Sequence, residues 1–117
     1  MNRVAGIEAE ARTYPTDSPE SDGTLEWDST TMVLVRVRAD GATGIGYTYA
    51  DGSVAGLIES VLAGAVEGRD ALATAECWQA MHAALRNAGQ AGAGAMALSA
   101  VDLALHDLRG RLLDAPV

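Results

Sequence analysis

The sequence has little that would support secretion, membrane insertion or nucleic-acid binding. Its single cysteine, Cys77, cannot form an internal disulfide and favours the cytosol. No apolar run approaches the roughly 18 residues that cross a bilayer, and the N-terminal MNRVAGIEAEA lacks the apolar core of a signal peptide. With 8 basic against 16 acidic residues, the net charge of −8 gives no electrostatic footprint for nucleic acid. We therefore expect a cytoplasmic protein that binds neither membranes nor nucleic acids.

Common catalytic and metal-binding patterns are also missing. There is no HExxH or cysteine cluster, and the glycine-rich stretch at 87–94 lacks the Lys-Ser/Thr pair of a phosphate-binding loop. Asp102 and His106 are spaced to share one face of a helix; a polar contact with a neighbouring element is favoured over a metal or acid–base pair. The acidic residues between 17 and 28 do not have calcium-loop spacing. The residues alone therefore identify no catalytic site.

Alternating apolar residues predict three strands, at about 3–12, 30–39 and 43–49. Asp40-Gly41 is a turn signal between the last two, and Gly44 and Gly46 indicate a bulge or a close backbone approach in the third. The intervening segment 13–29, TYPTDSPESDGTLEWDS, contains two prolines, a glycine and five carboxylates. It is predicted to be an irregular loop, and loops of this length are usually functional lids or disordered.

After the strands, the apolar period changes to that of a helix, with helices predicted at about 54–65, 71–87 and 95–113. Three strands followed by three helices predict an α+β domain with an antiparallel meander. The third helix has an unusually broad apolar surface, which suggests burial between two layers. Its main stripe is formed by Leu98, Val101, Leu105, Leu108 and Leu112, and Met96, Leu103 and Leu113 widen it.

The C-terminal stretch ALSAVDLALHDLRGRLLDAPV resembles the pattern SAxDxALWDLxGKxxGxPV, which closes the N-terminal capping domain of the enolase superfamily in its mandelate racemase and muconate-lactonizing branch. The strand around Ile7, the Pro15-to-Trp27 loop, TTMVLVRVRADG and TGIGYTYA follow in the family's order. His106 stands where the pattern usually has Trp. The matching positions are Ser99, Ala100, Asp102, Ala104, Leu105, Asp107, Leu108, Gly110, Pro116 and Val117.

The resemblance implies that residues 1–117 are one capping domain. In the family, a (β/α) barrel of roughly 200 residues follows, and its side chains hold magnesium and supply the bases. Because this sequence stops where the barrel would begin, we expect the chain alone to be inactive, with no catalytic or metal-binding residue of its own. Its implied role is to cap a magnesium-dependent acid-sugar dehydratase, racemase or cycloisomerase. The implied partners are a barrel, in cis or in trans, and a carboxylic-acid or acid-sugar substrate.

The same resemblance identifies candidate substrate contacts. In the family, the loops that correspond to 13–29 and 47–53 close over the barrel mouth and help to select the substrate. Each candidate could instead be an ordinary loop residue or an aromatic anchor on the sheet. The candidates are Pro15, Thr16, Asp17, Trp27, Tyr47 and Tyr49.

Two other function classes stay open. The same fold could be a non-catalytic interaction module that binds a separately encoded barrel or self-associates through the third helix, because an exposed apolar surface favours a partner. A homo-oligomer is expected on this ground. An unrelated α+β protein that binds a small molecule is the third class. Retention of the long 13–29 segment favours the capping role, since an interaction module has no reason to keep it.

Overall fold

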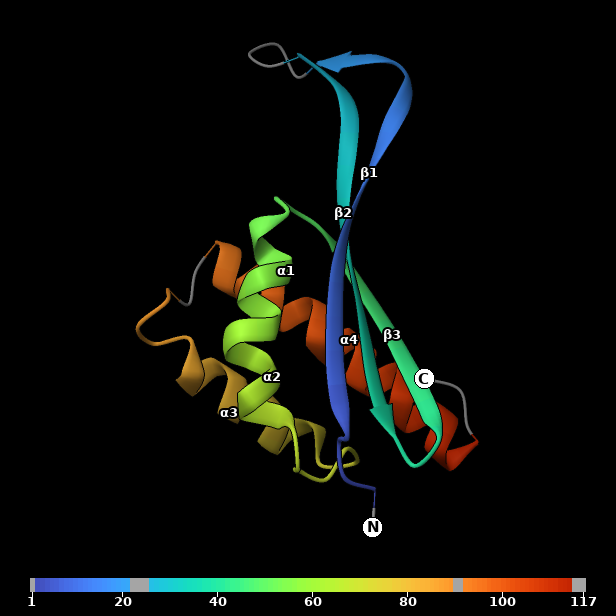
Figure 1. The fold of residues 1–117 in the computed structure, drawn as a ribbon, viewed down its shortest axis with the longest axis vertical. Coiled ribbons are helices and arrows are strands. Elements are labelled where there is room, and N and C mark those ends of the chain that lie inside the picture. The colour runs from blue at the N-terminus through green and yellow to red at the C-terminus, as the bar shows by residue number, and fades with distance from the viewer. Residues whose placement is uncertain (1, 22–25, 90–91, 115–117) are drawn as a thin grey trace.

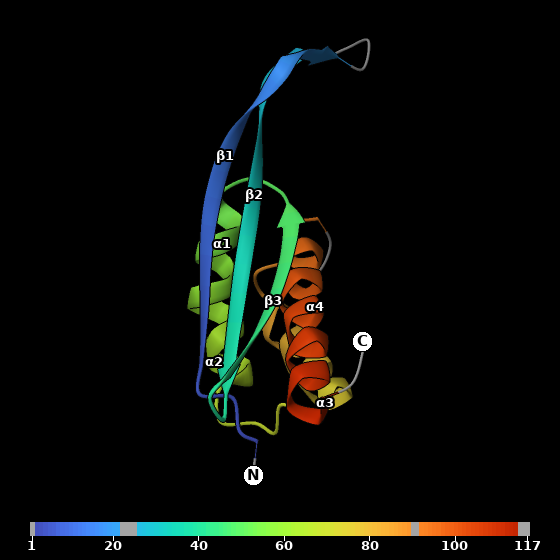
Figure 2. The same ribbon diagram turned by 90° about the vertical axis from the view of Figure 1, so that its right-hand side faces the viewer.

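The computed structural model describes residues 2–21, 26–89 and 92–114, with the backbone alone at 16–21 and 26–28. Three strands, β1 (Gly6–Ser21), β2 (Glu26–Ala39) and β3 (Ala42–Tyr49), form an antiparallel sheet in the order β1-β2-β3. The helices that follow cover one face of this sheet (Figures 1 and 2). The α+β fold class predicted from the sequence, a meander followed by helices, is thereby confirmed.

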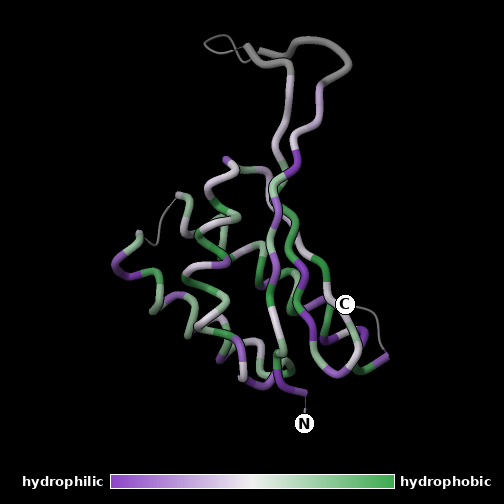
Figure 3. The backbone as a smooth tube through the Cα atoms, viewed as in Figure 1, coloured by the Kyte–Doolittle hydropathy of each residue, from purple (hydrophilic) through white to green (hydrophobic). Residues whose placement is uncertain are grey.

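Alternation along β2 separates the two faces of the sheet. Val33, Val35 and Val37 are fully buried on the helix side, and Figure 3 shows hydrophobic and hydrophilic residues alternating along the strands. Burial of each valine contributes about 1.5–3 kcal/mol relative to leaving it in water. Asp40 and Gly41 both have positive φ (49° and 77°), so a tight two-residue turn joins β2 to β3 as the sequence predicts.

The first helical stretch is continuous but not uniform. It consists of α1 (Ser53–Leu57), the π-helical segment η1 (Ile58–Leu62) and α2 (Ala63–Val66), where the sequence predicts one helix at about 54–65. Ile58 and Leu62 are fully buried in the core that this stretch forms with the sheet.

The second helix, α3 (Thr74–Ala84), is shorter than the predicted 71–87. Its start is displaced because residues 70–73 form a turn instead. There the Asp70 carboxylate accepts a hydrogen bond from the Leu72 N–H at 3.0 Å, and the Ala71 N–H donates to the Asn2 carbonyl at 2.7 Å. The first bond closes the turn, and the second fastens the N-terminal segment to the helical layer.

The long helix α4 (Ala93–Leu113) crosses the sheet next to β3. Leu105 and Leu108 on its main stripe are fully buried, whereas Met96 and Leu103 are each 43% exposed and Leu113 is 52% exposed. The helix ends with Asp114 in the left-handed conformation. Pro116 of the C-terminal motif lies outside the described residues.

Two glycines let α4 approach β3 closely. A Cβ on Gly44 would overlap the Ala104 carbonyl, and one on Gly46 would overlap the Ala100 carbonyl. Of the two alternatives that the sequence left open for these glycines, a close backbone approach is the one observed. The alanines of α4 at this contact serve the same purpose, because larger side chains would hold the helix away from the strand.

The prediction of an irregular loop at 13–29 is wrong. β1 continues through Ser21 and β2 starts at Glu26, so the two strands form a hairpin arm that projects beyond the helices (Figure 1). Their register shifts between Pro15 and Glu20. Pro15 is tolerated because β1 is an edge strand. The Ala9 N–H points away from β2 toward Glu59. Pro15 lies six residues further along the same strand, so its nitrogen also faces away from β2. No ladder hydrogen bond is therefore lost at the proline.

Candidate functional site

A hollow of about 400 Å³ lies where the hairpin arm leaves the body of the domain. It is lined by one residue pair from the first two strands, Tyr14 opposite Thr30, together with Pro15 and Tyr49. Tyr49 belongs to the last residue pair of β3, opposite Met32. The hollow thus forms at the point where a three-stranded sheet becomes a two-stranded arm.

The tyrosines reach this place because of strand alternation. Val33 and Val35 of β2 face the helices, so Met32 and Leu34 between them face the open side, and their β3 partners Tyr49 and Tyr47 face it too. The Tyr47 and Tyr49 rings lie 5.9 Å apart, edge to face at 75°. Tyr49 is 62% exposed. This gives a pre-arranged aromatic wall with two hydroxyl groups that can donate to or accept from a ligand.

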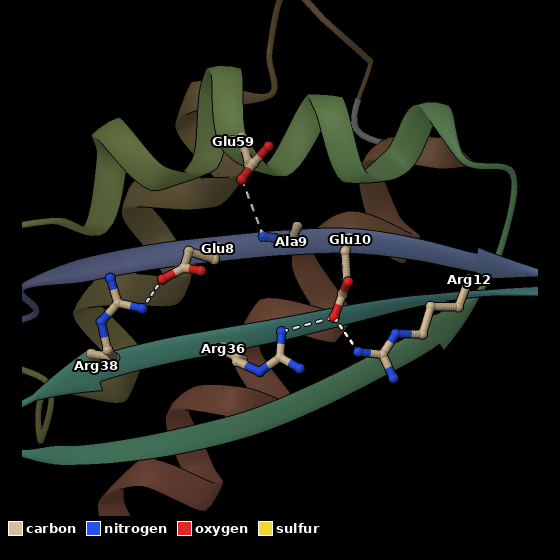
Figure 4. A network of polar contacts seen from close by, with 7 residues as sticks. All are labelled: Glu8, Ala9, Glu10, Arg12, Arg36, Arg38 and Glu59. Carbon is tan, nitrogen blue, oxygen red and sulfur yellow. Dashed lines mark hydrogen bonds and ion pairs between the residues drawn. The ribbon is translucent and has the colours of Figure 1, made fainter.

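The open face of the sheet, which carries the tyrosines, also carries a ladder of ion pairs between β1 and β2 (Figure 4). Glu8 pairs with Arg38, and Glu10 pairs with Arg36 at 2.9 Å and with Arg12 at 2.6 Å. The hydrogen bonds from Arg36 and then Arg12 lower the pKa of the Glu10 carboxyl. Because these groups are exposed, each pair stabilises the fold only slightly. These bonds favour the ionised form of Glu10, and the ladder contains three guanidinium groups against two carboxylates.

The structure brings only part of the predicted site together. Pro15 and Tyr49 line the hollow, and Tyr47 contacts Tyr49. For Thr16, Asp17 and Trp27 the described structure gives the backbone within β1 and β2, and their side chains lie outside the described residues.

Tyr14 and Thr30 line the hollow and were missed from the sequence. The signal existed, because Tyr14 continues the alternation of Glu10 and Arg12 onto the open face. The prediction of an irregular loop at 13–29 hides this signal, since a loop has no alternating faces.

Comparison with known proteins places this geometry in a family. The family model for the mandelate racemase / muconate lactonizing enzyme N-terminal domain matches residues 10–117. The chain belongs to this family, as its N-terminal domain.

Relatives agree with this assignment. A 3,6-anhydro-alpha-L-galactonate cycloisomerase from Streptomyces coelicolor is 42% identical over 84 residues, which are 68% of this chain and 23% of that protein. A mandelate racemase/muconate lactonizing enzyme-like protein from Rubrobacter xylanophilus is 59% identical, with a TM-score of 0.92 over 95% of this chain and 31% of that chain. A Streptomyces coelicolor racemase with bound magnesium is 34% identical, with a TM-score of 0.86 over 92% of this chain and 32% of that one. The chain therefore spans about a quarter to a third of these relatives.

The C-terminal motif that resembles the mandelate racemase/muconate lactonizing enzyme family has a structural role in α4. Ala100 and Ala104 are the small residues that Gly46 and Gly44 approach, and Asp107 accepts a hydrogen bond from the Ile45 N–H at 2.8 Å. Much of the motif therefore attaches α4 to β3 within this domain.

Asp102 and His106 pair with each other within α4, where the sequence predicts a polar contact with a neighbouring element. The His106 Nε2 atom lies 3.6 Å from Asp102 Oδ1 within the same helix. Asp102 also lines a second hollow of about 370 Å³ between α3 and α4, beside the stacked rings of Trp78 and His82. Within 2–21, 26–89 and 92–114, no group of three or more His, Cys, Asp or Glu residues could hold a metal ion. The described residues therefore do not fit the magnesium that the family implies.

Burial raises the pKa of the Cys77 thiol, and a buried, protonated thiol is a poor nucleophile.

Across the described part of the chain, every helix is too short or too polar to cross a bilayer.

Proposed function

We propose that this chain is the capping and specificity domain of a magnesium-dependent enolase-superfamily enzyme that acts on an acid sugar or a related carboxylic acid. The observation that carries the proposal is the aromatic hollow at the base of the projecting hairpin arm, formed by Tyr14, Pro15, Thr30 and Tyr49. An arm that extends beyond its own core can cover a neighbouring domain (Figure 2), and exposed tyrosines can hydrogen-bond a hydroxyl-rich substrate. The 3,6-anhydro-alpha-L-galactonate cycloisomerase among the relatives supports this substrate class.

In this role, the chain binds and orients but does not carry out the reaction. The arm and the segment 47–53 would exclude water from the mouth of a barrel and contact the substrate away from the reacting carbon. Magnesium, when bound by the barrel, would stabilise the negative charge that develops on the substrate carboxylate. The proton-transferring bases would belong to the barrel as well.

The test uses the natural polypeptide that carries residues 1–117 and the chain by itself. Intact mass in the native cell shows whether a barrel is attached. We expect a mass several times 12.0 kDa and magnesium-dependent proton exchange on acid sugars that EDTA abolishes, with no exchange by residues 1–117 alone. Exchange catalysed by residues 1–117 alone would overturn the assignment of catalysis to the barrel.

A second function is favoured by a different surface. Met96, Leu103 and Leu113 on α4 are substantially exposed, and apolar side chains on one helix can form a contact surface for another chain. The alternative is therefore an interaction module that binds a separate barrel chain or a second copy through α4. A natural product of about 12.0 kDa that forms a complex lost on Leu103→Asp would favour this alternative.

A further inference from the structure

Both outer strands of the sheet meet a carboxylate from a helix. β1 and β3 are the edges of the three-stranded sheet. Edge strands have backbone N–H and C=O groups turned outward, which can pair with a strand from another chain. The contacts at each edge therefore decide whether this sheet can grow.

At the β1 edge, the carboxylate belongs to Glu59. Its Oε2 atom accepts a hydrogen bond from the Ala9 N–H at 3.3 Å, across 50 residues of sequence (Figure 4). Ala9 is paired with Val35 but directs its N–H away from β2. Glu59 lies in the π-helical segment Ile58–Leu62. Single π-helical turns are rare and are frequent at functional sites.

At the β3 edge, the carboxylate belongs to Asp107 of α4. Its Oδ2 atom accepts from the Ile45 N–H at 2.8 Å and from Arg111 Nε at 3.1 Å. Desolvation raises the pKa of Asp107, but the bonds from the Ile45 backbone and from Arg111 outweigh it, so the pKa lies below its ordinary value. The group therefore stays ionised and acts as an acceptor at neutral pH.

We propose that Glu59 and Asp107 close both edges of the sheet to the addition of a fourth strand. Each carboxylate occupies one outward N–H that an incoming strand would need, and its charge and bulk lie in the path of that strand. Helices also cover one of the two faces of the sheet (Figure 2). Another chain that binds the body of the domain must then use the open face of the sheet or the helical layer, and not the strand edges.

Amide hydrogen exchange measured by NMR on the 117-residue chain tests each bond separately. Glu59→Ala should accelerate exchange at Ala9 by about fivefold, the effect of losing one net hydrogen bond, with Ile45 unchanged. Glu59→Gln is the matched variant, because its amide oxygen can accept the same bond, and it should stay within about twofold of the parent. Glu67→Ala removes a carboxylate just past the end of α2 and should leave Ala9 unchanged.

Sedimentation tests the consequence for association. The double variant Glu59→Ala/Asp107→Ala should form larger species as concentration increases, and their formation should be reduced when β1 carries Ala9→Pro, which removes the outward N–H. Circular dichroism establishes that each variant is folded. The proposal is overturned if Ala9 exchange is the same in Glu59→Ala and the parent, or if the folded double variant associates no more than the parent.

Discussion

The body of the domain and its hairpin arm are built from the same two strands on different physical grounds. In the body, β2 buries Val33, Val35 and Val37 beneath helices, and β3 lies against α4 through Gly44 and Gly46. In the arm, β1 and β2 continue as a two-stranded ribbon beyond the helices (Figure 1). A lone two-stranded ribbon is marginally stable in water. Stability therefore resides in the body, and the arm is free to be shaped by what it binds.

The largest effect on this contrast should come from the contact between β3 and α4. Gly46→Ala places a methyl group against the Ala100 carbonyl, and overpacking of this kind costs about 3 kcal/mol. Gly64→Ala is the control, because a Cβ there meets nothing within 4 Å and alanine is about 1 kcal/mol better than glycine in a helix. Urea unfolding should show a loss for the first and a gain for the second. Equal effects would contradict the close-approach explanation.

A smaller loss is expected where the arm joins the body. Tyr47→Ala removes the edge-to-face pair with Tyr49, which contributes about 1 kcal/mol. Tyr47→Phe keeps the ring and should retain the free energy of unfolding. If both variants lose the same amount, the hydroxyl and not the ring pair is responsible.

Acid should weaken the body through its ion-paired carboxylates. The pKa values of Glu10 and Asp107 are lowered in the folded state, so their contribution is present above the unfolded-state values of about 4.5 and 3.8. It is lost as pH falls through the lower folded-state values. The free energy of unfolding should therefore decrease below about pH 4.5. The decrease should be modest because solvent reaches both ion pairs, with 41% of the Glu10 side chain and 28% of the Asp107 side chain exposed. Glu10→Gln should flatten part of this dependence, and an unchanged pH profile would refute the contribution of the ladder.

The smallest effect on stability should come from removing the arm itself. Replacing residues 15–29 with Asn-Gly joins the paired residues Tyr14 and Thr30 by a favoured two-residue turn. The free energy of unfolding should change by less than about 1 kcal/mol, because little core is lost and the loop shortens. A change of about 3 kcal/mol, comparable to overpacking, would mean that the arm is part of the folding core.

The same contrast explains what could be predicted from the sequence. The body follows alternation and helical periodicity, so the order of its elements and the Asp40-Gly41 turn were predicted correctly. The arm has the composition of a loop, and its extension to Ser21 depends on an edge-strand position that tolerates proline.

Contacts between residues far apart in the chain could not be predicted from the sequence. Nothing local indicates that Glu59 would reach Ala9, 50 residues away, or that Asp107 would reach Ile45, 62 residues away. The candidate site shows the same division. Tyr47 and Tyr49 are predicted through the family resemblance, at the end of a strand that alternation makes clear, whereas Tyr14 and Thr30 depend on the hairpin pairing.

The central claim is that the arm selects the substrate of an attached or associated barrel. The most direct test measures kcat/KM of the natural polypeptide for two acid sugars that differ at one hydroxyl group, with Tyr49→Ala beside the parent. Ile45→Ala is the control, since Ile45 is exposed on the same strand but does not line the hollow. We predict that Tyr49→Ala changes the ratio of the two kcat/KM values by about fivefold, the effect of one lost hydrogen bond, while the control leaves the ratio unchanged. An unchanged ratio in a folded, active Tyr49→Ala enzyme would contradict the account.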